Sequence, residues 1–175
     1  MKHSKLRAAF LTLWGLGLVL FGVTIILGLP LAVSAVPGGI LDHQAAGTAA
    51  EVDRIQHEWR LAALWNRAAL AMMSDLVFIG IYGIGSVLGG LYFFRSGRGA
   101  VRWIGGAVLL AGGIFLATDY IETISQFSQL MRFEGDDAKA ALAATVRPVK
   151  VAAWIATFAG ILAALAIRRF QRRAS

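Results

Sequence analysis

Three acidic residues of this sequence lie at the ends of long apolar runs, where a charged side chain is costly to keep. Asp75 stands near the start of one run, and Asp119 and Glu122 stand near the end of the next. Because Asp119 and Glu122 are three residues apart, they share one face of a helix. Charged residues in such places pair with one another or form functional sites. These three carboxylates are therefore the candidate site.

The spacing predicts that the same carboxylates reach one level of a membrane. Each lies 17 to 20 residues from Arg95 or Arg102, the basic residue at the opposite end of its run. Arg147 and Lys150 lie 21 and 18 residues from Arg168 in the same way. At ~1.5 Å per helical residue, all of them reach the outer boundary of the hydrocarbon. We expect the three carboxylates and the two cations to meet there.

Three interpretations of this cluster remain open. In the first, the carboxylates form salt bridges with Arg147 and Lys150 and so hold the helices together. In the second, they bind a ligand or a cation, with Tyr82 on the same helix face as Asp75. A divalent cation would suit their hard oxygen ligands, although the metal is unknown and no other cofactor is expected. In the third, one carboxylate acts as an acid or base, but no Ser-His-Asp or His-Glu-x-x-His pattern supports it, so we assign no catalytic residue.

The elements that must position these residues are transmembrane helices. The chain is 58% hydrophobic over 175 residues, and about 20 apolar residues are enough to cross a bilayer. We place four spans at residues 8–29, 72–94, 102–122 and 149–167. The sequence therefore predicts an all-α polytopic membrane protein, a single four-helix bundle over residues 1–175. The first run is longer than the apolar core of a signal peptide, so we expect it to be retained as an anchor.

The charge distribution predicts the orientation. The N-terminus, the turn over 95–102 and the C-terminus carry ten Lys or Arg and no acid, whereas the other segments carry seven cations and all ten acids. The positive-inside rule then puts both termini in the cytoplasm. The absence of cysteine excludes disulfide and thiol chemistry and fits a bacterial inner membrane.

The basic C-terminal tail is expected to meet the membrane surface. Its four arginines are Arg168, Arg169, Arg172 and Arg173. Clusters of this kind beside a span attract anionic lipids, so lipid is the expected partner of the tail. No pattern of basic and aromatic residues indicates a nucleic-acid partner.

Two helical extensions are predicted on the outer side. Thr48 and Glu51 have the spacing of a capping box, which starts an outer helical segment over 48–71. Because no Gly or Pro occurs from residue 48 to residue 79, we expect this segment to run without a break into the second span. The alternative is an interfacial helix that lies flat on the membrane, with Trp59 and Trp65 at the level of the headgroups. A stripe on the helix after the third span consists of Ile121, Ile124, Phe127/Ser128 and Met131, and we expect it to pack against this segment. An outer loop over 134–147 follows, with a turn over 134–137 and an Ala-rich short helix that ends at Val146. Pro148 is expected in the first turn of the fourth span.

Small residues and histidines carry weaker predictions. Gly85-x-x-x-Gly89 favours close packing within the chain, with a homo-oligomer or another membrane-protein partner as the alternative. His43 and His57 each have one acidic neighbour, which is too few ligands for a metal site. We therefore expect both histidines on the solvated surface.

The segment over 74–82, Ser-Asp-Leu-Val-Phe-Ile-Gly-Ile-Tyr, and the segment Asp119-Tyr-Ile-Glu122 resemble a group of bacterial four-helix integral membrane proteins. The resemblance covers the two central spans and implies a fold and a topology, but no activity. The function we expect is that of a membrane binding or accessory protein with an outer-leaflet carboxylate site. A small cation- or proton-coupled transporter or channel is one alternative, and a membrane-embedded lipid-modifying enzyme is another.

Overall fold

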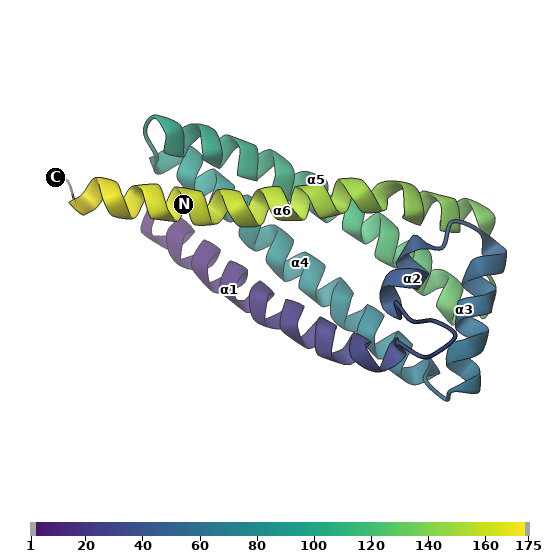
Figure 1. Cartoon of the computed structure of the whole chain (residues 1–175). Helices are drawn as coiled ribbons and strands as arrows, with labels where there is room; N and C mark the ends of the chain where they lie inside the picture. The colour runs from purple at the N-terminus through teal and green to yellow at the C-terminus, as the bar shows by residue number, and fades with distance from the viewer. Residues whose placement is uncertain (1–2, 174–175) are drawn as a thin grey trace. The chain divides into compact units, whose positions relative to one another are not determined.

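The computed structural model describes residues 3–173, and this part of the chain is all-helical with no β-strand. Figure 1 shows the order of the helices along the chain. They are α1 (His3–Gly28), the short 3₁₀ helix η1 (Leu29–Leu31), α2 (Ile40–Ala45), α3 (Ala49–Leu61), α4 (Trp65–Ser96), α5 (Ala100–Arg132) and α6 (Asp137–Arg173).

Four of these helices are long and apolar enough to cross a membrane, which confirms the predicted helical class and the four candidate spans. The helical segments concerned are His3–Leu31, Trp65–Ser96, Ala100–Arg132 and Asp137–Gln171. Each of them contains one predicted span and extends beyond it at both ends. Length and composition therefore identify an integral membrane protein.

The prediction of one unbroken helix through the outer segment 48–71 is wrong, because α3 ends at Leu61 and α4 begins at Trp65. Ala63 has φ 56°, a left-handed conformation that ends a right-handed helix. The amide of Leu64 donates to the carbonyl of Trp59 at 2.7 Å and closes the helix end. Trp59 is itself fully buried and donates its indole N–H to the Leu31 carbonyl at 2.9 Å. The hydrogen bond of the buried Trp59 thus fixes the end of α3, although the sequence has no Gly or Pro there that would predict a helix end.

Within the predicted outer loop over 134–147, the chain is helical from Asp137, as expected for the Ala-rich segment. The expectation that this helix ends at Val146 is wrong, because it continues into the fourth span as α6. Pro148 lies inside α6 and not in its first turn. Proline has no N–H, so the carbonyl of Ala144 loses its usual helical donor. A helix through apolar surroundings still satisfies nearly all other backbone groups internally, which is why spans tolerate proline.

The chain divides into two compact units, and every long helix contributes to both. Unit 1 consists of Met1–Leu18, Gly80–Ala117 and Lys150–Ser175, and unit 2 consists of Val19–Ile79 and Thr118–Val149. The expectation of a single domain over residues 1–175 stays a prediction.

Unit 1 is held together by close helix contacts at glycines, as the sequence predicts for Gly85 and Gly89. A Cβ atom at Gly85 would lie 2.6 Å from the backbone nitrogen of Trp14 on α1. A Cβ atom at Gly89 would lie 2.8 Å from the ring of Phe10, also on α1. The Gly-x-x-x-Gly face of α4 is therefore occupied by α1 of the same chain.

Unit 2 has an apolar core beneath α2 and α3. On α3, Val52, Ile55 and Trp59 are buried in this core. At the start of α3, the hydroxyl of Thr48 accepts the Glu51 amide at 3.3 Å, which confirms the predicted N-cap. The Glu51 carboxylate does not complete the capping box but binds Arg54 at 2.7 Å instead.

Candidate functional site

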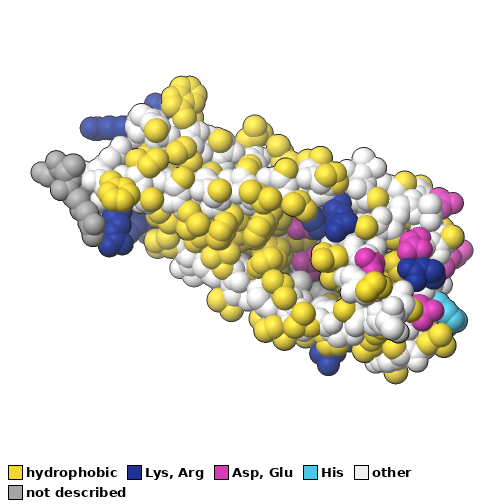
Figure 2. Space-filling view, in the orientation of Figure 1, with side chains coloured by type: hydrophobic (Ala, Val, Ile, Leu, Met, Phe, Trp, Pro, Cys, Tyr) yellow, Lys and Arg dark blue, Asp and Glu magenta, His cyan; other side chains and the backbone are white. Residues whose placement is uncertain are grey.

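The C-terminal half of α5 buries its polar face and exposes its apolar face. Ile121, Ile124 and Met131 are 41%, 54% and 42% exposed, so the predicted packing of the stripe on the segment 48–71 is wrong for these three residues. Phe127, in the same stripe, is half-buried and packs against the core that includes Ile55 and Trp59. A helix in water shows the opposite arrangement, whereas a helix among lipids turns polar side chains toward its protein neighbours. In Figure 2, hydrophobic side chains cover much of the visible surface, and acidic and histidine side chains gather around α3.

Unit 2 consequently has a polar interior beside its apolar core. Its buried polar side chains are at most 3% exposed, and they are His43, Gln56, Asp119, Glu122, Thr123, Gln126 and Gln129. As predicted, Asp119 and Glu122 share one helix face, and that face points inward. Some of this polarity is structural, because both ends of the Gln129 amide hold backbone groups, the Ser125 carbonyl and the Asp136 amide.

Asp75 and Asp119 are joined through one hydroxyl group. Thr123 Oγ1 lies 3.1 Å from Asp75 Oδ2 on α4 and 3.5 Å from Asp119 Oδ1 on its own helix. A second tie between the helices lies close by, where Tyr120 donates its hydroxyl to the Leu76 carbonyl at 3.3 Å. The structure therefore brings together two of the three predicted carboxylates, and it places the third, Glu122, next to the residue that bridges them.

A small enclosed pocket of about 40 Å³ adjoins this bridge. Its lining includes oxygen-bearing side chains from four helices, namely Thr24 of α1, Gln44 of α2, Asp75 of α4, and Thr123 and Gln126 of α5. Thr24 is held in place by the hydroxyl of Ser74 at 3.1 Å. The volume is enough for a bare ion or a few water-sized groups, and too small for an organic ligand.

His43 is fully buried, so the prediction of a solvated position is wrong for this histidine and right for the exposed His57. Its ring packs on Trp59 with centroids 5.2 Å apart, and its Nε2 lies 3.2 Å from Gln56 Nε2. Gln126 links it to the pocket by donating to its backbone carbonyl at 3.5 Å. Burial lowers the pKa of His43 to about 4, so the ring is neutral at pH 7.

The remaining predicted site residues lie as follows. Arg147 is a half-buried residue of α6 in unit 2, whereas Tyr82 and Lys150 belong to unit 1. Tyr82 is fully buried, and its hydroxyl lies 3.0 Å from that of Thr157. The pairing of the carboxylates with Arg147 and Lys150 stays a prediction.

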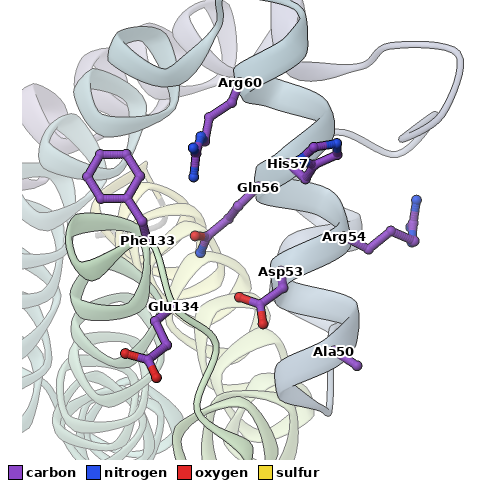
Figure 3. Close-up of a pocket in the computed structure, with 8 residues that line it drawn as sticks. All are labelled: Ala50, Asp53, Arg54, Gln56, His57, Arg60, Phe133 and Glu134. Atoms are coloured by element: carbon purple, nitrogen blue, oxygen red, sulfur yellow. The ribbon is translucent and has the colours of Figure 1, made fainter.

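A larger and more open pocket of about 480 Å³ lies between α3 and the loop after α5. Figure 3 shows Asp53, Gln56 and Arg60 pointing from α3 toward Phe133 and Glu134, while Arg54 points away. Two of the charged groups of this pocket, Asp53 and Arg60, have partners in the protein. Asp53 accepts the Gly135 amide at 2.6 Å, and the Arg60 guanidinium lies 5.1 Å from the centre of the Phe133 ring. This pocket is therefore explained by the packing of α3.

Comparisons of the chain with protein-family models, with curated proteins and with solved structures find no match. The function must therefore be argued from the site itself. Within residues 3–173, no three His, Asp or Glu side chains converge as ligands of one metal ion. The pocket beside Thr123 instead offers one carboxylate among neutral oxygen atoms.

Proposed function

We propose that this protein is a membrane protein that binds a small monovalent cation in the pocket beside Asp75. The observation that carries the proposal is the polar interior of unit 2, enclosed by a surface with exposed apolar side chains at Met73, Val77, Ile121 and Ile124. Polar and ionisable groups buried in membrane proteins are costly and usually serve ligands or ions. The enclosed pocket beside Asp75 is where such a ligand would fit.

The donor set supports the charge of the ligand. Asp75 supplies one negative charge, and Thr24, Gln44, Thr123 and Gln126 supply hydroxyl or amide oxygen atoms. Oxygen ligands suit hard cations, and one carboxylate balances one positive charge. The volume of about 40 Å³ requires the cation to shed most of its water, which these side-chain oxygens would replace.

The shared hydroxyl gives Asp119 a role in binding. While the Thr123 hydroxyl donates to Asp75, its hydrogen is bonded to the carboxylate oxygen Oδ2, which a cation in the pocket would need as a ligand. Rotation of the hydroxyl toward Asp119 would release that oxygen and turn the Thr123 lone pairs toward the pocket. Asp119 thus accepts the hydrogen in the bound state.

Thermal unfolding of the full-length protein in a neutral detergent tests this function. Sodium, potassium, ammonium, magnesium and calcium chlorides are added at constant ionic strength. A cation that binds only the folded protein stabilises it by about 3 kcal/mol when its concentration is about 100 times Kd. We expect one monovalent cation to raise the melting temperature of the wild type, and Asp75→Asn and Asp119→Asn to abolish that shift. Glu134→Gln, which removes an exposed carboxylate, is the matched control and should keep it.

The salt-bridge interpretation predicts a different result for the Asp119 variant. If Asp119 only balances a cation such as Arg147, then Asp119→Asn destabilises the protein in every salt, and adding Arg147→Gln restores much of the loss. A wild type insensitive to all five cations, together with this rescue, would exclude the binding site. A shift with magnesium or calcium alone would also contradict the proposed monovalent ligand.

We further propose the orientation that the charges predict, with both termini in the cytoplasm of a bacterial cell and α2 and α3 outside its inner membrane. The support is the absence of acids beside the ten Lys and Arg of the termini and the turn between α4 and α5. In this orientation the pocket beside Asp75 lies in the outer half of the membrane.

A further inference from the structure

Unit 1 is a purely cationic part of the molecule. Its three segments contain eleven Lys and Arg residues and no Asp or Glu, whereas all ten acidic residues belong to unit 2. No arginine of unit 1 can therefore be neutralised by a carboxylate of its own unit. Where several of these arginines lie close together, their mutual repulsion is relieved only by an anion from outside the unit.

Three of them converge on a pocket of about 320 Å³. Arg7 comes from the start of α1, and Arg168 and Arg169 come from the end of α6. The apolar wall consists of aromatic rings that are at most 6% exposed, those of Phe10, Tyr92 and Phe93. We refer to this feature as the arginine pocket.

Arg168 is held in a fixed geometry at the centre of the arginine pocket. Its Nη1 donates to the hydroxyl of Ser96 at 3.1 Å, and its Nη2 donates to the Ser96 carbonyl at 3.5 Å. The guanidinium also lies over the Tyr92 ring, 4.7 Å from its centre. Ser96 is fixed in turn, because its hydroxyl donates to the Tyr92 carbonyl at 2.6 Å. A guanidinium carries five N–H donors, so Ser96 leaves several of them for a ligand.

The other two arginines are exposed and flank this fixed group from two helices. Arginine forks match the oxygen pairs of phosphate and carboxylate, and they bind phosphate more strongly than single point charges do. The tail predicted to meet lipid thus includes Arg168 and Arg169, while the side chains of Arg172 and Arg173 lie outside the described residues.

The position of the arginine pocket along the helices indicates where its ligand comes from. Its residues lie within about two turns of the ends of α1, α4 and α6, three of the helices that could cross a membrane. Lipid headgroups are found at this level, and exposed apolar side chains of α6 such as Leu162 continue from it along the span. Basic pockets between transmembrane helices hold anionic headgroups.

We propose that the arginine pocket binds the phosphate of an anionic phospholipid, such as phosphatidylglycerol. Arg168 receives the phosphate oxygens on its fixed face, and Arg7 and Arg169 close around the phosphate from either side. The aromatic wall excludes water from these contacts, which strengthens them. The acyl chains extend along the apolar surface of the span. This site is independent of the cation pocket in unit 2.

The test measures lipid binding to the delipidated full-length protein in a neutral detergent by native mass spectrometry. The ligands are phosphatidylglycerol, the zwitterionic phosphatidylcholine and inorganic phosphate. The variants are Arg7→Gln and Arg169→Gln, both at exposed positions. The control is Arg98→Gln, which removes the same charge from an exposed position of the same unit outside this pocket.

We expect the wild type to retain phosphatidylglycerol in preference to phosphatidylcholine. Each pocket variant should bind phosphatidylglycerol about tenfold more weakly, as expected for the loss of a hydrogen bond between charged groups, and the control should change by less than about twofold. Equal losses in all three variants would show a general charge effect and overturn the proposal. Equal binding of both lipids would likewise exclude a site for an anionic lipid. Inorganic phosphate that bound as tightly as phosphatidylglycerol would make free phosphate the ligand and would also overturn the proposal.

Discussion

Thr123 on α5 donates its hydroxyl to Asp75 on α4 across 3.1 Å, inside the polar interior of unit 2. The same oxygen lies 3.5 Å from a carboxylate oxygen of Asp119, one turn earlier on α5. A hydroxyl has one hydrogen to donate, so the two carboxylates compete for it. Binding of a ligand or a proton at one carboxylate therefore changes the hydrogen bond that the other receives from Thr123. This coupling makes Thr123 the residue on which the candidate site can be tested most directly.

Replacing Thr123 by valine should destabilise the protein by about 1–3 kcal/mol. Valine keeps the branched shape but has no hydroxyl, so the half-buried carboxylate of Asp75 loses a hydrogen-bond donor. The cation-dependent rise in melting temperature should also disappear, because an oxygen ligand of the pocket is removed. Thermal unfolding in detergent, with and without the cation, measures both effects.

Thr123→Ser is the matched control for this experiment. Serine keeps the hydroxyl and loses only a methyl group, so the cation-dependent shift should persist even if stability falls slightly. If valine and serine behaved alike, the hydroxyl bridge would have no part in binding.

The buried His43 should make the protein less stable in acid. Its pKa is about 4 in the folded protein and 6.5 when exposed. Above pH 6.5 both states are neutral, and His43 has no effect on the pH dependence. Between pH 6.5 and 4 the His43 side chain binds a proton in the unfolded chain but stays neutral in the folded protein. The free energy of unfolding therefore decreases as the pH falls. The loss reaches roughly 3 kcal/mol near pH 4.

Melting temperatures between pH 7.5 and 4.5 test this prediction on the wild type, His43→Gln and His57→Gln. The slope over this range should flatten in His43→Gln, whatever its absolute stability. His57 is exposed, so its variant should follow the wild type. An unchanged slope in His43→Gln would mean that the titration belongs to other groups.

The long helices could be predicted from the sequence because continuous apolar runs leave no other way to satisfy the backbone in a membrane. The residues at which individual helices begin and end could not be predicted in this way. Ala63 adopts a left-handed conformation that its residue type does not suggest, and it does so where Trp59 anchors the preceding turn. Pro148 carries a helix-breaking signal that the length of α6 overrides.

The candidate site could be predicted only in part. Counting residues along the helices was enough to put Asp119 and Glu122 on one buried face. The role of Thr123 was missed, although it is four residues from Asp119 and so on the same face. His43 was missed because its burial depends on Trp59 and Gln56, which follow 13 or more residues later. The apolar stripe of α5 was assigned inward because periodicity does not tell whether water or lipid surrounds a helix.

Reporter fusions should confirm the proposed orientation. A reporter fused after Gly97, in the turn between α4 and α5, should report a cytoplasmic position, as should one after Ser175. A reporter after Gly135, between α5 and α6, should report an external one. The measurement is the activity of two reporters, one that is active only in the periplasm and one that is active only in the cytoplasm, at each fusion position. An external result at Gly97 would refute the orientation and move the cation pocket to the opposite half of the membrane.

Two glycines of α1 should respond in opposite ways to the same substitution. A Cβ atom at Gly17 would lie 2.6 Å from the Cα of Tyr82 on α4, and the backbone there cannot move aside without separating the helices. Gly17→Ala should therefore destabilise the protein by about 1–3 kcal/mol. At Gly15 nothing lies within 4 Å, so Gly15→Ala should be neutral or stabilise the helix by up to about 1 kcal/mol. Thermal unfolding of the two variants in one detergent gives the comparison directly. Equal stability of the two would mean that α1 and α4 do not approach at Gly17, and the buried contact between the hydroxyls of Tyr82 and Thr157 would then need another support.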